Sequence, residues 1–180
     1  TDDKLFVEKK RWVKGKVVVD TVKMISNLCK IKSRNEFIAK IIDSLRKKDE
    51  RKILVLSGRI DHLKELKGLV DNMILEKDEY KTAFYIGGMK DYELDDAATA
   101  DILFGTYSMA EEGLDIDGLN TLVLATPKKD IIQSIGRIMR KPIEEGDINP
   151  LVIDIRDKLS CMQMWGDKRM TYYEKKKYNI

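Results

Sequence analysis

The chain has 180 residues and a formal net charge of +3, and none of its apolar runs approaches the roughly 20 residues of a membrane-spanning helix. Its single histidine, His62, excludes His-rich metal sites and Ser-His-Asp or Cys-His catalysis centred elsewhere. The two cysteines, Cys29 and Cys161, lack any metal-ligand spacing, which indicates reduced thiols of an intracellular protein without a disulfide.

Residues 1–32 predict a basic N-terminal extension or linker. Because residue 1 is threonine, we expect the chain to be a piece of a longer protein, in which this linker leads from a preceding domain. Val17–Val19 predict a short strand or an extended arm, and apolar residues at helical spacing predict a helix over 21–31.

Residues 33–158 predict one α/β domain. A capping box at Ser33–Glu36 predicts the start of a helix. Its expected apolar stripe consists of Phe37, Ile38, Ile41, Ile42 and Leu45. We then expect strands at 53–56, 82–86, 102–104, 121–124 and 151–153, with helices over 63–70, 91–98 and 129–140. Apolar strands that alternate with amphipathic helices indicate a parallel sheet covered on both faces, whose ligands lie beyond the carboxyl ends of the strands.

Residues 159–180 predict a C-terminal helix or tail that begins near Leu159. The tail places aromatic residues (Trp165, Tyr172, Tyr173 and Tyr178) around the lysines 175–177. Such residues can stack on nucleic-acid bases, but more often the rings of a last helix pack on the core, and we favour packing.

The net charge is distributed unevenly along the chain. It is +8 over residues 1–52, −8 over 53–128 and +3 over 129–180. Basic segments on either side of an acidic centre suit a chain that follows a nucleic-acid backbone. Solvated surfaces would give the same pattern, so charge alone leaves both interpretations open.

The segment 130–140 carries the most informative pattern. Gln133, Gly136, Arg137 and Arg140 are spaced so that they share one helical face, while isoleucines and Met139 share the other. A glycine destabilises a helix by roughly 1 kcal/mol relative to alanine, which a solvent-exposed face seldom requires. The close approach of a phosphate would explain Gly136, and guanidinium groups one turn apart suit a transferring phosphate. The alternative is a surface helix with two unrelated arginines.

A second informative segment, 105–116, follows a predicted buried strand. Thr106 and Ser108 offer hydroxyl groups and backbone amides that can hold a phosphodiester. Gly113 permits close backbone approach, and Asp115 can accept a hydrogen bond from a ribose hydroxyl. Alone, this segment fits equally a polar turn between a strand and a helix.

Together the two segments resemble motifs V and VI of superfamily-two helicases. Gln133-x-x-Gly136-Arg137-x-x-Arg140 matches the Q-x-x-G-R-x-x-R signature, and residues 112–116 match the E-G-L-D-I core of motif V. Residues 53–66 look like motif IV, so the resemblance covers most of the chain. The residues that make up these motifs are similar to those of helicases from phages and large DNA viruses, of the branch-migration and transcript-release types. The resemblance implies a RecA-like parallel sheet, the C-terminal half of a helicase motor.

The resemblance also implies roles for individual residues. Arg137 and Arg140 would reach the γ-phosphate of ATP, and Gln133 would orient nearby groups. The residues expected around the nucleotide are Gly113, Asp115, Glu112 and Gly136. The residues expected to hold the nucleic-acid backbone are Thr106, Ser108, Gly58, Arg59, Gly87 and Gly88. Thr106 precedes Gly113 by seven positions where DEAD-box proteins usually have six, so the phosphate contact falls to either Thr106 or Ser108. Gln133 also stands where DEAD-box proteins normally have histidine.

The chain lacks a P-loop and a DExD or DExH box, which hold ATP and Mg²⁺. We therefore expect both to be bound mainly by a separate N-terminal RecA-like domain, which is this chain's partner together with DNA or RNA. No metal site or membrane contact is expected here, and a viral protein of this kind would act in the host cytoplasm, a virus factory or the virion. A degenerate, non-catalytic nucleic-acid-binding module is the alternative, but the intact 133–140 pattern speaks against it.

Overall fold

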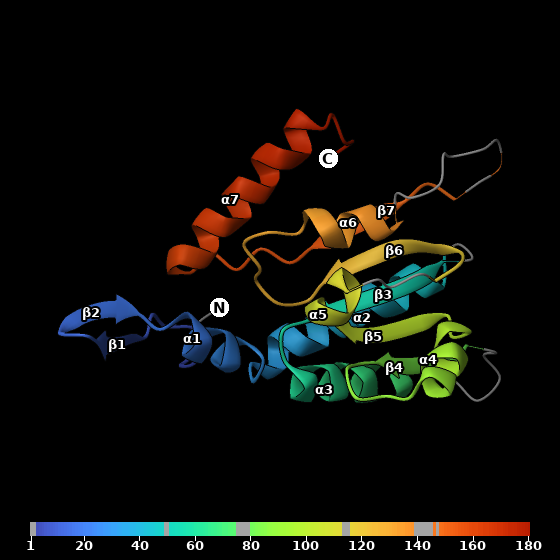
Figure 1. The fold of residues 1–180 in the computed structure, drawn as a ribbon, viewed down its shortest axis with the longest axis horizontal. Coiled ribbons are helices and arrows are strands. Elements are labelled where there is room, and N and C mark those ends of the chain that lie inside the picture. The colour runs from blue at the N-terminus through green and yellow to red at the C-terminus, as the bar shows by residue number, and fades with distance from the viewer. Residues whose placement is uncertain (1–2, 49–50, 75–79, 113–115, 139–145, 147) are drawn as a thin grey trace.

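A five-stranded parallel sheet forms the centre of the chain in the computed structural model (Figure 1). The structure describes residues 3–48, 51–74, 80–112, 116–138, 146 and 148–180. The strands of the sheet are β3 (Lys52–Ser57), β4 (Thr82–Tyr85), β5 (Ile102–Thr106), β6 (Leu119–Leu124) and β7 (Leu151–Asp154). They lie in the order β4-β5-β3-β6-β7, and every neighbouring pair is parallel. This RecA-like arrangement confirms the predicted fold class.

Helices cover both faces of this sheet. The helices of the described residues are α1 (Thr21–Leu28), α2 (Lys32–Arg46), α3 (Ile60–Asp71), α4 (Asp91–Ala98), α5 (Tyr107–Glu111), α6 (Ile132–Ile138) and α7 (Ser160–Lys175). Successive strand residues point to opposite faces, so Ile53 and Val55 join the core under α2 and α3. Leu54 and Leu56 join the other core, which α5, α6 and α7 cover. Because both faces of β3 are buried, its residues 53–56 are all apolar, as the sequence suggested.

The N-terminal residues form a separate hairpin. Strands β1 (Lys10–Val13) and β2 (Lys16–Val19) pair antiparallel, and the hairpin projects away from the sheet in Figure 1. Beyond it, α1 and the start of α7 pack together around a third, smaller core. This core includes Met24, Leu28, Ile31 and Met162. The short strand and the helix expected in this region are both confirmed.

The predicted start of α2 needs correction. The helix begins at Lys32 with Ile31 as its N-cap residue, and no side chain caps it, so Ser33 lies inside the first turn. The reason is tertiary: Ile31 is fully buried in the third core, and its carbonyl oxygen accepts a hydrogen bond from the Asn35 amide. The buried face of α2 carries Ile38, Ala39 and Ile42, whereas Phe37, expected in that face, is 57% exposed.

The C-terminal helix packs its rings on the body of the chain. Tyr173 is buried in the core beneath α7, where Tyr172 and Tyr178 pack against the same cluster. Trp165 packs instead against the third core. The packing interpretation of the tail is therefore confirmed. Both cysteines are free, and among the described residues no helix combines the length and the apolar character needed to cross a membrane.

Candidate nucleotide and nucleic-acid site

The carboxyl ends of the strands meet at one edge of the sheet. In the parallel register Ser57 pairs with Thr106, Leu56 pairs with Leu124, and Tyr85 pairs with Gly105. The segments that follow β3, β4, β5 and β6 therefore begin side by side. Most of the predicted site residues that the structure describes lie in these segments, at the edge where ligands of such sheets bind.

Gly58 and Gly87 leave this edge after β3 and β4. The Gly58 amide donates a hydrogen bond of 2.9 Å to Thr126 Oγ1, which joins the end of β3 to the segment after β6. A Cβ at Gly87 would lie 3.9 Å from Met109 Sδ, so the end of β4 lies against α5. Gly88 has a φ of +88°, a left-handed conformation that favours glycine. Gly58, Gly87 and Gly88 are all exposed, so a ligand can approach their backbone.

Arg59, predicted to hold the nucleic-acid backbone, is largely occupied within the chain. Its guanidinium donates to the Gly58 carbonyl oxygen at 2.7 Å, to Ser26 Oγ at 3.2 Å and to the Val22 carbonyl oxygen at 3.4 Å. Two of these acceptors belong to α1. Arg59 therefore attaches α1 and the preceding hairpin to the carboxyl edge of the sheet.

Thr106 and Ser108 flank the turn from β5 into α5. Thr106 is the N-cap residue of α5, and its hydroxyl accepts a hydrogen bond from the Met109 amide at 3.4 Å. Thr106 is half-buried, whereas Ser108 is exposed. The predicted polar turn is therefore a single helical turn, with the Ser108 hydroxyl open to solvent and the Thr106 hydroxyl partly engaged.

Helix α6 presents two distinct faces. Ile131, at its start, and Ile135 are buried in the core, while Gln133 and Gly136 are exposed. Apart from its two chain neighbours and the backbone of its own helix, no atom of the described residues lies within 4 Å of the position that a Cβ at Gly136 would take. Packing among the described residues therefore gives no reason for this glycine, whose exposed face is open to a ligand or another domain.

The buried face of α6 differs from the predicted one at two positions. Ile132 is 53% exposed, and Ser134 is fully buried in its place. The physical reason is helical geometry: residues 131, 134 and 135 lie within one turn on the same side, and Ile132 lies a further 100° away. The Ser134 hydroxyl has no hydrogen-bond partner among the described residues.

Several predicted site residues lie outside the described residues. These are Gly113, Asp115 and Arg140, together with the side chain of Arg137. The backbone of Arg137 belongs to the last turn of α6, four residues beyond Gln133. Glu112 is exposed and follows α5.

Two contacts connect α5 with the segment that leads into α6. Lys128 forms an ion pair with Glu111 of α5, and its ammonium group lies 4.7 Å from the centre of the Tyr107 ring. The Tyr107 hydroxyl donates to the Thr126 carbonyl oxygen at 2.7 Å. Burial raises the pKa of Tyr107, so the phenol remains a donor at neutral pH. Side-chain contacts therefore join α5, in the first predicted segment, to the residues that lead into α6, in the second.

Comparison with known proteins decides the family. Residues 33–142 match the family described as the helicase conserved C-terminal domain. The chain belongs to this family.

Relatives of this helicase C-terminal domain occur in large DNA viruses. A protein of Acanthamoeba polyphaga mimivirus, provisionally named ATP-dependent RNA helicase L396, is 44% identical over 162 residues, which cover 88% of this chain and 30% of the relative. A protein of Invertebrate iridescent virus 6, provisionally named helicase 161L, is 31% identical over 119 residues, which cover 66% of this chain and 24% of the relative. The chain thus spans less than a third of each of these relatives.

Solved structures share the fold of this helicase C-terminal domain. The crystal structure of T4 UvsW matches with a TM-score of 0.67 and 24% identity, over 92% of this chain and 36% of that one. The C-terminal domain of the DEAD-box protein Dbp5 matches with a TM-score of 0.55 and 15% identity, over 74% of this chain and 78% of that one. At these identities the likeness concerns the fold.

One buried ionic contact in the domain has no signal in the sequence. Arg169 of α7 donates two hydrogen bonds of 2.7 Å to the Asp154 carboxylate at the end of β7, and a third to the Lys128 carbonyl oxygen. Tyr173 donates to the same carboxylate at 2.9 Å. Burial lowers the pKa of Arg169, but the bonds to Asp154 outweigh it and the net shift is upward. Arg169 therefore holds α7, β7 and the segment before α6 together.

The domain also buries its histidine on the opposite face of the sheet. His62 Nδ1 lies 3.0 Å from Ser57 Oγ, and Nε2 lies 3.0 Å from Asn35 Oδ1. Burial, and then the nearby Arg34, lower the pKa of His62 to about 3. The imidazole is therefore neutral at physiological pH and connects β3, α3 and α2.

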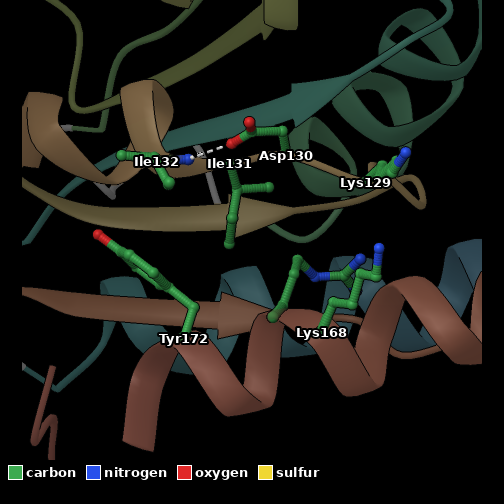
Figure 2. A pocket seen from close by; sticks show the side chains of 7 residues that line it. Lys129, Asp130, Ile131, Ile132, Lys168 and Tyr172 are labelled. Carbon is green, nitrogen blue, oxygen red and sulfur yellow. Dashed lines mark hydrogen bonds between the residues drawn. The ribbon is translucent and has the colours of Figure 1, made fainter. Parts of the chain in front are cut away.

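A cavity of about 360 Å³ lies between α7 and the residues that begin α6 (Figure 2). Its lining residues are Lys129, Asp130, Ile131, Ile132, Lys168, Arg169 and Tyr172. Asp130 Oδ1 accepts a hydrogen bond from the Ile132 amide at 3.1 Å, which caps the start of α6. Because the Arg169 guanidinium is already bonded to Asp154 and Lys128, the other charged groups that line the cavity are the exposed side chains of Lys129, Asp130 and Lys168.

Proposed function

We propose that this chain is the C-terminal motor half of an ATP-dependent superfamily-two helicase or translocase that remodels DNA or RNA. The observation that carries the proposal is the open face of α6. Gln133 and Gly136 are exposed there, on the helix that follows β6, and β6 ends beside β3 at the carboxyl edge of the sheet. This face is available to a nucleotide held by another domain.

In this proposal Arg137 and Arg140 act as arginine fingers on the γ-phosphate of ATP. Both guanidinium groups remain charged at any physiological pH and match the geometry of phosphate oxygens. Gln133 precedes Arg137 by one helical turn and would orient groups beside the phosphate. Glu112, Gly113, Asp115 and Gly136 would line the cleft. ATP and Mg²⁺ would be held mainly by an N-terminal RecA-like domain, and hydrolysis of ATP supplies the free energy for movement.

The glycine at position 136 fits the approach of a phosphate group. Its Cβ direction is free of described atoms, so a side chain there would project into the space that the ligand needs. The contacts of Lys128 and Tyr107 connect α5 to the residues before α6. A displacement of α6 at the nucleotide would therefore reach α5, beside Thr106 and Ser108. This connection is the physical route by which we propose that nucleotide closure changes the grip on nucleic acid.

Nucleic acid would run along the ends of β3, β4 and β5. Thr106 or Ser108, with the exposed backbone of Gly58, Gly87 and Gly88, offers amides and hydroxyl groups to phosphate oxygens. Such contacts carry no base preference, which suits a motor that moves over any sequence. Because several relatives are named as RNA helicases, we expect the bound strand to be RNA. A DNA strand is the comparison in the assay.

The test is ATP turnover by the longer protein that contains this chain and its ATP-binding domain. We expect Arg137→Ala and Arg140→Ala each to lower kcat by about 10³-fold while ATP still binds, because an arginine finger contributes 10³–10⁵ in rate. Lys64→Ala is the matched control, because Lys64 is an exposed cation of α3 with one long ion pair to Asp61. Turnover within threefold of the unaltered protein in both arginine variants would contradict the proposal.

A further inference from the structure

The N-terminal hairpin has a composition that the core of the domain does not explain. Five of the eight residues 9–16 are lysine or arginine, and none is acidic. Trp12, in the middle of β1, is 75% exposed, and every residue of β1 is exposed. Burying a tryptophan normally contributes several kcal/mol to stability, so an exposed one on a projecting strand marks a contact surface.

The pairing of the strands groups these residues. Trp12 pairs with Val17, and Lys10 pairs with Val19, so these four side chains share one face of the ribbon. Arg11 pairs with Val18 on the other face. The ribbon thus offers an exposed ring with cationic side chains on both sides. Lys10 lies 3.4 Å from Glu8, but Arg11, Lys14 and Lys16 form no ion pair with any residue that the structure describes.

A lysine occupies the strained position at the tip. Lys14 has a φ of +48° and Gly15 a φ of +77°, as a two-residue hairpin turn requires. Asparagine or glycine adopts the first position readily, whereas a longer side chain is strained there. The turn geometry alone therefore does not favour a lysine, and the residue adds positive charge at the tip of the hairpin.

The base of the hairpin is held firmly. The Asp20 amide donates to the Lys9 carbonyl oxygen at 2.7 Å, and Ser160 of α7 donates to the Glu8 carboxylate. Val19 packs against the third core, next to α1. Through Arg59, α1 is bonded to the segment that follows β3 at the carboxyl edge. The ribbon is consequently a projecting arm with a fixed root, and its root adjoins the proposed path of the nucleic acid.

We propose that the hairpin β1–β2 binds a single-stranded segment of the nucleic acid, with Trp12 stacked on a base and the lysines on the phosphates. The presence of a nucleic-acid strand rests on the proposed function, whereas the chemistry of the contact rests on the residues of the hairpin itself. An aromatic ring stacks on any base and cations follow any backbone, so the contact is independent of sequence. The net charge of this surface matches a polyanion, whereas an apolar protein surface would leave these cations unpaired.

The experiment uses the 180-residue chain with Trp165→Phe, which leaves Trp12 as its single tryptophan. Single-stranded oligonucleotides of thymidine or uridine, 20 residues long by design, are titrated while the Trp12 emission is recorded. We expect saturable quenching without ATP. The double variant Lys14→Glu/Lys16→Glu should weaken binding at least tenfold and reduce the slope of log Kd against log salt by about 1.4, since each phosphate contact contributes about 0.7 for single strands.

The matched control is Lys40→Glu/Lys64→Glu, which reverses two exposed lysines of α2 and α3 and should leave the affinity within twofold. Unchanged Trp12 emission, or equal affinity in the hairpin and control variants, would overturn the proposal. So would a change of Trp12 emission caused by the ATP-binding domain without nucleic acid, because the ribbon would then be a contact between domains. The readout needs no ATP, so it is independent of the arginine variants that test the proposed function.

Discussion

The two faces of the central sheet each bury an arginine–carboxylate pair, but only one of them also buries a histidine. Beneath α2 and α3, Arg34 of α2 pairs with Asp157, and the imidazole of His62 lies between Ser57 and Asn35. Beneath α5, α6 and α7, Arg169 pairs with Asp154, and the less buried Lys128 pairs with Glu111. Both faces therefore depend on buried charge-assisted bonds, whereas the face beneath α2 and α3 also contains a group that burial keeps neutral. The stability of the two faces should therefore respond differently to pH.

The largest effect should follow removal of the buried charge on α7. Arg169→Met would leave the Asp154 carboxylate buried with only Tyr173 as donor, and breaking a buried pair in this way typically destabilises by about 3–5 kcal/mol. Urea denaturation of the 180-residue chain measures this loss. Arg156→Met is the matched control, because Arg156 also joins α7, through Asp167, but at 35% and 59% exposure of the two side chains. We expect its effect to stay below about 1 kcal/mol. If both variants lose the same free energy of unfolding, the buried Asp154 contact contributes no more than the exposed pair, which would contradict this prediction.

A smaller, pH-dependent effect should come from His62, beneath α2 and α3. Burial lowers the pKa of His62 from its usual value of 6.5 to about 3 in the folded chain, so between these values the unfolded chain binds a proton that the folded chain does not. The contribution of His62 to the free energy of unfolding is therefore fully present above pH 6.5. It falls as the pH drops, by roughly 2 kcal/mol between pH 6.5 and 5. His62→Gln should flatten this dependence when the two unfolding curves are compared at each pH.

The single histidine also permits a direct check of that pKa. Because His62 is the only histidine, its imidazole resonances can be followed by NMR without ambiguity. We expect them to stay at their neutral positions down to pH 5. A midpoint near 6.5 would contradict the buried, neutral assignment.

The smallest effect should come from the contact between α5 and the segment before α6. Lys128→Met removes the ion pair with Glu111, whose side chains are 25% and 34% exposed, and the cation over Tyr107. Solvent screening limits the change to about 1 kcal/mol or less in thermal or urea unfolding. A loss of stability as large as that of Arg169→Met would contradict the expected order of these two contacts beneath α5, α6 and α7.

The sequence by itself determined the order of strands and helices and the fold class. Continuous apolar runs identified all five strands of the sheet, and helix 91–98 has the bounds that its pattern predicted. The spacing of apolar residues over a short stretch predicts which side of an element is buried, and for this reason these elements could be predicted from the sequence. The strand-end segments then brought Gly58, Gly87 and Thr106 to one edge, as a parallel sheet requires.

Only the tertiary structure decided which polar residues pair. The pairs of Arg169 with Asp154, Arg59 with α1 and His62 with Asn35 join positions 15 to 37 residues apart, and no local pattern encodes such choices. The same holds for Ser134 replacing Ile132 in the core and for Ile31 setting the start of α2. Helix phase and helix ends follow from what packs against them, and that information lies in the other elements of the fold.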